Sequence, residues 1–292
     1  MILRVFVLAL DGLEYKLVKR WRLMNLLQSY HGVFKIQRQY FITGPLKWAN
    51  YRIIASPYTP IIWTSFLTGK EPRDHGVKEL RTYVKIPEVL RYLKVIHRVK
   101  KVINGVLGLG LGRLLGILPP FIVDKRDIPY PTIFDVVKNS IAVWFICYNE
   151  PSWIFNMISN TLKSDLAKVP KVLGRIYKLR KRKVFKNIHA NWKLFGAYFE
   201  IADILGHLYI VKRPLVMLRV YLELNRLVKG LKSNMPDDTA FIIVSDHGMR
   251  PSPDKIWGIH SNHAFWSSNV RLPFKPRDHT DFFYLILELL DN

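Results

Sequence analysis

Long, nearly uninterrupted hydrophobic runs recur along this chain and are separated by mixed polar segments. The runs are of strand length and rich in β-branched and aromatic residues, which is typical of strands buried on both faces of a parallel sheet. The sequence therefore predicts core strands at residues 3–10, 141–148, 194–201 and 239–248, with a shorter strand at 51–55.

The segments between these runs carry the spacing of amphipathic helices. Helices are predicted at residues 13–29, 133–139, 160–187 (one helix or a pair), 213–230 and 281–290. Another begins near Thr59, which is predicted to be its N-cap because Pro60 suits the first helical position. The alternation predicts an α/β fold, a three-layer α/β/α sandwich with a largely parallel sheet, in one domain over residues 1–292.

The region 85–190 interrupts this alternation and is predicted to form a cap inserted over the carboxyl edge of the sheet. It contains the Gly- and Leu-rich segment 104–123, where Arg113, glycines and two prolines argue against a membrane-spanning helix. With the basic stretch before it, 91–123 is a candidate for peripheral membrane contact. Lys and Arg also cluster at 168–186, either as a solvated face or as an anion-facing surface.

The charge balance narrows the class of partner. The 292 residues include 45 Lys and Arg against 22 Asp and Glu, a formal net charge of +23, so the protein attracts anions. Phosphorylated substrates, nucleotides, nucleic acid and anionic membranes all fit this field. The single cysteine, Cys147, excludes an intrachain disulfide and is predicted to be a buried strand residue. The apolar N-terminus is interpreted as a strand, not a signal peptide, which favours a cytoplasmic location.

Three of the predicted strands lead into acidic or histidine residues, namely Asp11, then Asp203 with His207, then Asp246 with His247. Because the carboxyl ends of parallel strands share one edge of a sheet, these side chains can converge. Mixed Asp and His ligands suit zinc or manganese, and a pair of such ions suits hydrolysis at phosphorus. Plainer interpretations are a surface pair for Asp203 and His207 and a core histidine for His247.

Five stretches carry a more specific pattern: Asp11-Gly12, TPIIWTSFLTGKEPRDHGV (59–77), YFEIADILGH (198–207), SDHGM (245–249) and GIHSNHAFW (258–266). In this order they resemble the metal-binding blocks of the type I phosphodiesterase/nucleotide pyrophosphatase family, within the alkaline phosphatase superfamily. The blocks extend over nearly the whole chain. Their combination is specific, although any one stretch alone is weak.

The resemblance implies an alkaline phosphatase-like fold, two divalent metal ions (zinc or manganese) and cleavage of phosphodiester or nucleotide pyrophosphate bonds. It places Asp11, Thr59, Asp246 and His247 on one ion, and Asp203, His207 and His260 on the other. Thr59 would also be the nucleophile, attacking in line to give a phospho-threonine intermediate that water hydrolyses. His263 competes with His260, which is preferred for its Gly-x-His setting, and His75 belongs to a structural turn of the pattern.

The chain departs from this pattern beside Thr59. Animal nucleotide pyrophosphatases carry an Asn three residues after the nucleophile as a donor to the phosphoryl oxygens, and here that residue is Ile62. Pro60 also removes one backbone N–H. The N–H of Ile61 or a basic residue of the cap is expected to replace these donors. Two alternatives stay open: a phosphomonoesterase or phosphonate hydrolase of the same superfamily, and a non-catalytic protein that binds anions or membrane surfaces.

Overall fold

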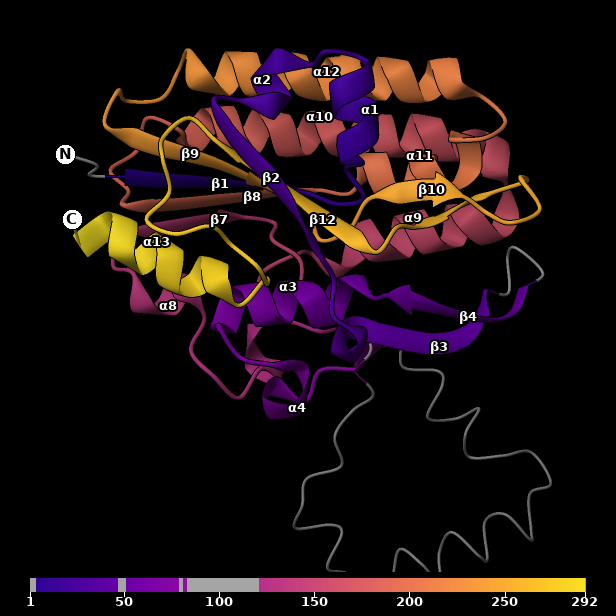
Figure 1. The fold of residues 1–292 in the computed structure, drawn as a ribbon, viewed down its shortest axis with the longest axis horizontal. Helices are drawn as coiled ribbons and strands as arrows, with labels where there is room; N and C mark the ends of the chain where they lie inside the picture. Colours follow the sequence, from indigo (N-terminus) through magenta and orange to yellow (C-terminus); the bar gives the residue numbers. More distant parts are fainter. Residues whose placement is uncertain (1–3, 47–50, 79–80, 83–120, 292) are drawn as a thin grey trace, which may run out of the picture.

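A six-stranded mixed sheet forms the centre of the computed structural model, which describes residues 4–46, 51–78, 81–82 and 121–291 (Figure 1). Its strand order is β2-β12-β9-β1-β8-β7. These strands are β1 (Arg4–Leu10), β2 (Tyr30–Lys35), β7 (Ser140–Val143), β8 (Leu194–Phe199), β9 (Thr239–Val244) and β12 (His263–Ser268). Strands β7, β8, β1 and β9 run parallel, and β12 is antiparallel to both of its neighbours. The predicted α/β class with a largely parallel sheet is confirmed.

Helices cover both faces of the sheet (Figure 1). One face carries α1 (Tyr15–Arg20), α2 (Met24–Leu27), α10 (Val169–Asn187), α11 (Ile201–Tyr209) and α12 (Pro214–Lys232), with α9 (Ser152–Ser164) packed against α10. The other face carries α3 (Thr59–Thr68), α8 (Ile133–Val136) and α13 (Asp281–Asp291), and α4 (Pro72–His75) follows α3.

Smaller elements complete the described chain. Three two-stranded sheets pair β3 (Phe41–Leu46) with β4 (Tyr51–Pro57), β5 (Arg81–Thr82) with β6 (Phe121–Ile122), and β10 (Met249–Pro251) with β11 (Gly258–His260). Single 3-10 turns occur at Arg38–Tyr40, Lys125–Asp127 and Leu166–Lys168.

The central strand β1 explains why the sheet needs both helical layers. Successive side chains of a strand point to opposite faces. Val5, Val7 and Ala9 join the core beneath α3 and α13, whereas Phe6, Leu8 and Leu10 join the core beneath α10 and α12. All six side chains are buried, so neither face of β1 tolerates solvent. Polar groups are left to the carboxyl edge, where the strand runs into Asp11.

Several predicted boundaries are wrong, and the strands predicted at 194–201 and 239–248 already end at Phe199 and Val244. The strand predicted at 141–148 ends at Val143, because Trp144 and Cys147 adopt positive φ angles of 47° and 60° that no strand accommodates. Cys147 is buried as expected, but in a turn. The helix predicted at 13–29 is split into α1 and α2, with Arg22 at a φ of 50° between them. The N-cap of α3 is Tyr58, and Thr59 is its first helical residue.

The inserted cap predicted over 85–190 is only partly described. Its residues 85–120, which hold most of 91–123 and of the Gly- and Leu-rich segment, lie outside the described ranges. Of the remainder, β7 pairs with β8 in the central sheet and α10 covers that sheet, so both belong to the main layers. A cap formed by the undescribed part stays a prediction. Within the described ranges, no helix combines the length and apolarity needed to cross a bilayer.

Candidate metal centre

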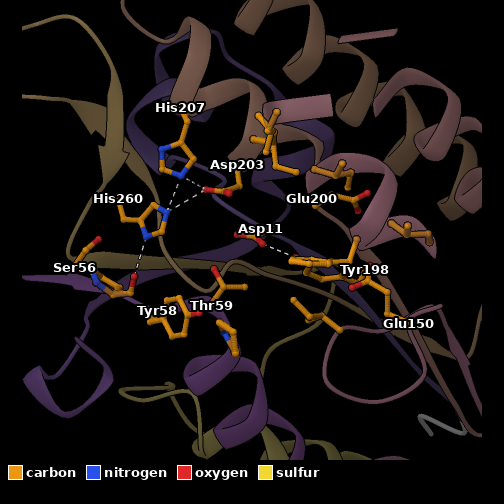
Figure 2. Close-up of a pocket in the computed structure, with 18 of the residues that line it drawn as sticks. Asp11, Ser56, Tyr58, Thr59, Glu150, Tyr198, Glu200, Asp203, His207 and His260 are labelled. Carbon is orange, nitrogen blue, oxygen red and sulfur yellow. Dashed lines mark hydrogen bonds and ion pairs between the residues drawn. The ribbon is translucent and has the colours of Figure 1, made fainter. Parts of the chain in front are cut away.

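The carboxyl ends of β1 and β9, helix α11 after β8, and strand β11 bring together the six Asp and His residues predicted as ligands. Figure 2 shows four of them, namely Asp11, Asp203, His207 and His260. The side chains form two groups, in each of which one ligand atom per residue lies within 4.8 Å of the others. One group is Asp11, Asp246 and His247, and the second is Asp203, His207 and His260. The convergence expected from strand topology is therefore present among the described residues.

The first group is buried at the ends of β1 and β9. His247 Nε2 lies 3.1 Å from Asp246 Oδ2 and 3.6 Å from Asp11 Oδ1. The other oxygen of each carboxylate is fixed: Tyr198 donates its hydroxyl proton to Asp11 Oδ2, and Gly12 N–H donates to Asp246 Oδ1 at 3.2 Å. One oxygen of each carboxylate thus faces His247.

The second group joins α11 to β11. Asp203 lies in the first turn of α11, and His207 follows one turn later on the same face, as residues four apart do. His207 Nε2 and His260 Nε2 lie 3.4 Å and 3.3 Å from Asp203 Oδ1, and 3.0 Å from each other. Both rings therefore direct Nε2 at one carboxylate oxygen, so Asp203 and His207 are not merely a surface pair.

The two groups are neighbours. The rings of His247 and His260 stack with centroids 3.6 Å apart and an interplanar angle of 18°. Each ring belongs to a different group, so the two groups are in direct contact. Paired catalytic metals lie ~3.5–4 Å apart in enzymes that transfer phosphoryl groups. Each group is a candidate for one ion, and the two groups adjoin.

The hydrogen bonds of the histidines also fit a metal. His207 Nδ1 lies 2.8 Å from the carbonyl of Gly258, and His260 Nδ1 lies 2.8 Å from the carbonyl of Pro57. Since a carbonyl only accepts, both Nδ1 atoms carry the proton and both Nε2 lone pairs face the group. Metal-binding histidines are oriented in this way. Buried oxygens with no hydrogen-bond partner in the described chain complete the fit: Asp11 Oδ1, Asp203 Oδ1 and Asp246 Oδ2.

Burial also makes the charged form of these carboxylates unfavourable unless a cation compensates it. Burial raises the pKa of Asp11 well above its ordinary value, and the charges of Asp246 and Asp203 add to this. Burial likewise raises the pKa of Asp246. Burial also acts to raise the pKa of Asp203, but His207, His260 and His247 outweigh burial, and the pKa of Asp203 is lowered. A divalent ion would offset this desolvation and repulsion.

Thr59 faces this centre from α3. Its Oγ1 lies 3.2 Å from His247 Nε2, and it lines the same cavity as Asp11 and His260. Because Tyr58 takes the capping position, the hydroxyl of Thr59 is not used to cap the helix. The N-terminus of this ten-residue helix favours an anion at the same place.

Two glycines allow the elements to approach. Gly12 has a φ of +69°, and a Cβ there would lie 2.6 Å from Asp203 Cα, so only glycine lets α11 begin against the end of β1. A Cβ at Gly258 would lie 2.2 Å from the carbonyl oxygen of Gly206. The absence of a side chain at Gly258 therefore lets β11 pack closely against α11, which places His260 beside His207.

A family model for the type I phosphodiesterase / nucleotide pyrophosphatase family matches residues 5–271. The chain belongs to this family. The family indicates a hydrolase of phosphoester bonds, and the superfamily depends on metal ions, in line with the two ligand groups.

Two solved structures are similar to this chain. Murine ectonucleotide pyrophosphatase / phosphodiesterase 5 is 16% identical, with a TM-score of 0.44, over 86% of this chain and 59% of that one. Phosphonoacetate hydrolase from Sinorhizobium meliloti 1021, in complex with phosphonoacetate, is 13% identical, with a TM-score of 0.47, over 87% and 58%. The chain thus spans less than two thirds of the length of either protein. A comparison with curated proteins gives no match.

Within the family pattern, the structure separates the competing histidines. His260 belongs to the second group, whereas the side chain of His263 is exposed on β12. His75 lies outside both groups, at the end of the short helix α4, where its Nε2 is 3.0 Å from Ser65 Oγ. One replacement expected for the missing phosphoryl donor is already engaged, because Ile61 N–H donates to the carbonyl of Tyr58 at 3.1 Å.

Sequence reasoning missed a layer of residues behind the centre. Tyr198 holds Asp11, and the guanidinium of Arg180 lies 5.3 Å from the Tyr198 ring centroid. Arg180 is fully buried and forms ion pairs with Glu150 and Glu200, which both line the cavity. Burial raises the pKa of Glu150 to about 7 despite Arg180. The sequence offered one signal, Tyr198, a residue with a hydroxyl in the apolar run 194–201. Arg180 could not be recognised because it lies within the basic run 168–186.

Proposed function

We propose that this protein is a two-metal phosphodiesterase that uses Thr59 as its nucleophile. The observation that carries the proposal is the position of the Thr59 hydroxyl, 3.2 Å from His247 and at a helix N-terminus, beside two adjoining Asp/His groups. A hydroxyl, a positive helix end and paired metal sites are the components that displacement at phosphorus needs.

In this proposal Asp11, Asp246, His247 and Thr59 hold one ion, and Asp203, His207 and His260 hold the second. The mixture of imidazole and carboxylate ligands suits zinc, with manganese as the alternative. When bound, the ions supply Lewis-acid stabilisation of charge on the phosphoryl oxygens and lower the pKa of a coordinated hydroxyl.

The residues of the chain carry the remaining steps. Thr59 Oγ1 attacks phosphorus, its proton leaves to solvent, and the bond to the leaving oxygen breaks to give a phosphorylated threonine. Water then attacks phosphorus, the bond to Oγ1 breaks, and the threonine is regenerated. Tyr198 keeps Asp11 oriented throughout, and the N-terminus of α3 stabilises the anionic phosphoryl group.

The charges around the cavity favour a diester over a pyrophosphate. Its charged lining residues within the described chain are all acidic apart from histidine: Asp11, Glu150, Glu200 and Asp203. Although the protein carries a net charge of +23, these residues offer no cationic partner for a second phosphate. A phosphodiester, with one negative charge, is thus better matched than a nucleotide pyrophosphate.

The test is hydrolysis of bis-p-nitrophenyl phosphate and p-nitrophenyl phosphate after chelation and resupply of zinc or manganese. Thr59→Ala should lower kcat for the diester by roughly 10³-fold or more, because no other hydroxyl replaces the nucleophile. Thr68→Ala is the matched control, since Thr68 is a buried threonine at the other end of α3 whose hydroxyl bonds the carbonyl of Thr64.

Preference for the monoester would instead identify a phosphomonoesterase built on the same centre. Absence of metal-dependent turnover, or full activity in Thr59→Ala, would overturn the mechanism and favour a protein that only binds anions.

A further inference from the structure

The cavity at the metal centre is largely aliphatic. It has a volume of about 350 Å³ and extends from Thr59, Asp11 and His260 along α9 and α11. Ten of its twenty lining residues are Ile, Leu, Phe or Pro: Ile42, Pro57, Pro60, Ile146, Ile154, Phe155, Ile158, Leu162, Ile204 and Ile259. The candidate catalytic groups thus line the same cavity as these apolar side chains. Figure 2 shows Thr59, Asp11 and His260 in this cavity.

A second cavity of about 450 Å³ extends this chamber. The two cavities share lining residues from α9 and α11: Phe155, Ile158, Leu162, Asp203, Ile204 and His207. The second adds Leu166, Leu208 and Trp257, with Lys163 as its one basic residue among those described. Two adjoining, mainly apolar chambers therefore meet at Asp203 and His207.

Several hydrophobic side chains of these chambers are exposed to solvent. Leu162, Leu166 and Ile42 are 37%, 43% and 37% exposed, although each lines a cavity. Grouped apolar side chains that stay exposed around a cavity mark a binding surface for an apolar ligand. Because the cavity that holds this ligand is also lined by Thr59 and Asp203, we interpret the apolar ligand as part of the substrate.

The polar groups of the first cavity do not suit a nucleobase or a sugar. Among its described lining residues there is no Asn, Gln, Lys or Arg to read the edge of a base or to bind a second phosphate. The acidic lining residues Glu150 and Glu200 are paired with Arg180. Tyr198 donates to Asp11, so these polar groups are already engaged. A polar substrate would then leave most of its donors and acceptors unpaired against isoleucines, which is costly. A hydrocarbon chain has no hydrogen-bond donors or acceptors to leave unpaired.

We propose that the substrate is a lipid phosphodiester, whose aliphatic chain occupies these two chambers while its phosphate lies at Thr59. The inference rests on the proposed phosphodiesterase function and adds the substrate class. Each methylene transferred from water contributes about 0.8 kcal/mol, or roughly a fourfold gain in kcat/KM.

The experiment compares ethyl and octyl p-nitrophenyl phosphate, which share the leaving group and differ only in chain length. In each, Thr59 Oγ1 bonds to phosphorus and p-nitrophenolate leaves, and water then releases the monoalkyl phosphate. With the octyl ester kept below its micelle concentration, its kcat/KM should exceed that of the ethyl ester at least about 100-fold. Leu162→Gln should lower this ratio about tenfold, because Leu162 lines both chambers.

Leu215→Gln is the control, since Leu215 is 70% exposed on α12 and lines neither chamber; it should leave the ratio unchanged. Binding provides a second readout that needs no turnover. Calorimetry of metal-loaded Thr59→Ala should show octylphosphonate binding at least about 100-fold more tightly than ethylphosphonate.

Equal kcat/KM values for the two esters, with turnover abolished in Thr59→Ala, would overturn the lipid inference and leave the phosphodiesterase standing. Such a result would mean that something other than substrate fills the chambers. Failure to cleave either ester in a Thr59-dependent manner would overturn the proposed function, and equal binding of the two phosphonates would separately overturn the apolar site.

Discussion

His207 and His260 direct their Nε2 atoms at each other across 3.0 Å, while each ring gives its Nδ1 proton to a backbone carbonyl. Two lone pairs at that separation repel unless a cation lies between or beside them. Burial opposes a proton on His260, yet Asp203 is close enough to raise its pKa above the ordinary value. A divalent ion would satisfy both rings and Asp203 at once, which fits the proposed second metal site.

The first prediction uses two histidines three residues apart, His260 on β11 and His263 on β12. His260→Ala should lose about one equivalent of bound metal, because it removes a ligand of the second group. His263→Ala should retain full metal content, since its side chain is exposed on β12 and outside both groups. Elemental analysis after dialysis checks both; equal metal content in the two variants would contradict the assignment of His260.

The second prediction is a stability effect whose sign depends on metal. In metal-free protein, Asp246 is buried beside Asp11 with its pKa raised, so the charged carboxylate is unfavourable. Asp246→Asn keeps the acceptor for Gly12 N–H and removes the charge. It should therefore stabilise the metal-free protein by on the order of 1 kcal/mol.

With metal in excess, the wild type should be more stable than Asp246→Asn. Metal at a free concentration of 100 Kd adds roughly 2.7 kcal/mol to the free energy of unfolding of the wild type, whereas the variant binds metal poorly. Denaturant unfolding of both proteins with chelator and with zinc measures the four free energies. Destabilisation of Asp246→Asn under both conditions would mean that the carboxylate is structural and not a metal ligand.

The central strands could be predicted because a strand buried on both faces leaves a continuous apolar run. Such a run ends visibly at Asp11 and at Asp246. The same rule failed at 141–148, where only the first part is a strand. A buried turn is as apolar as a buried strand, and the positive φ of Cys147 leaves no mark on hydrophobicity.

The converging Asp and His residues could be predicted from the sequence because their spacing follows the family pattern. The Arg180 cluster could not. In the basic run 168–186 a lysine or arginine on the solvated face and one in the core look identical, and only the packing of α10 against β8 distinguishes Arg180. The partners Glu150 and Glu200 are far from it in sequence, so no local signal links them.

The third prediction contrasts two neighbouring cations of α10. Arg180 is fully buried between two carboxylates, so Arg180→Met should cost about 3–5 kcal/mol by leaving them unpaired. Lys181 pairs with Glu223 at 3.0 Å, but both side chains are more than a third exposed. Lys181→Met should therefore cost less than about 1 kcal/mol.

Urea unfolding of the two variants gives both values. A triple variant, Arg180→Met with Glu150→Gln and Glu200→Gln, should recover much of the loss, since no buried charge is left without its partner. Equal costs at Arg180 and Lys181 would show that the cluster contributes no more than a surface pair.

The fourth prediction concerns the acid stability of the turn after α3. Burial lowers the pKa of His75 to about 4, from an ordinary value of 6.5. Its Nδ1 accepts the N–H of Val77 at 3.1 Å, so Nε2 carries the proton toward Ser65, and a second proton on Nδ1 would break the bond to Val77. The folded protein therefore resists a proton that the unfolded chain accepts.

The sign follows from this difference in proton binding. The contribution of His75 to the free energy of unfolding is complete above pH 6.5 and is lost as the pH falls from 6.5 towards about 4. His75→Gln cannot titrate in this window, so its stability should fall less than that of the wild type between about pH 7.5 and about pH 4.5. Urea unfolding across that range measures the difference between the two curves. A difference that stays constant with pH would mean that His75 is not held neutral by the fold.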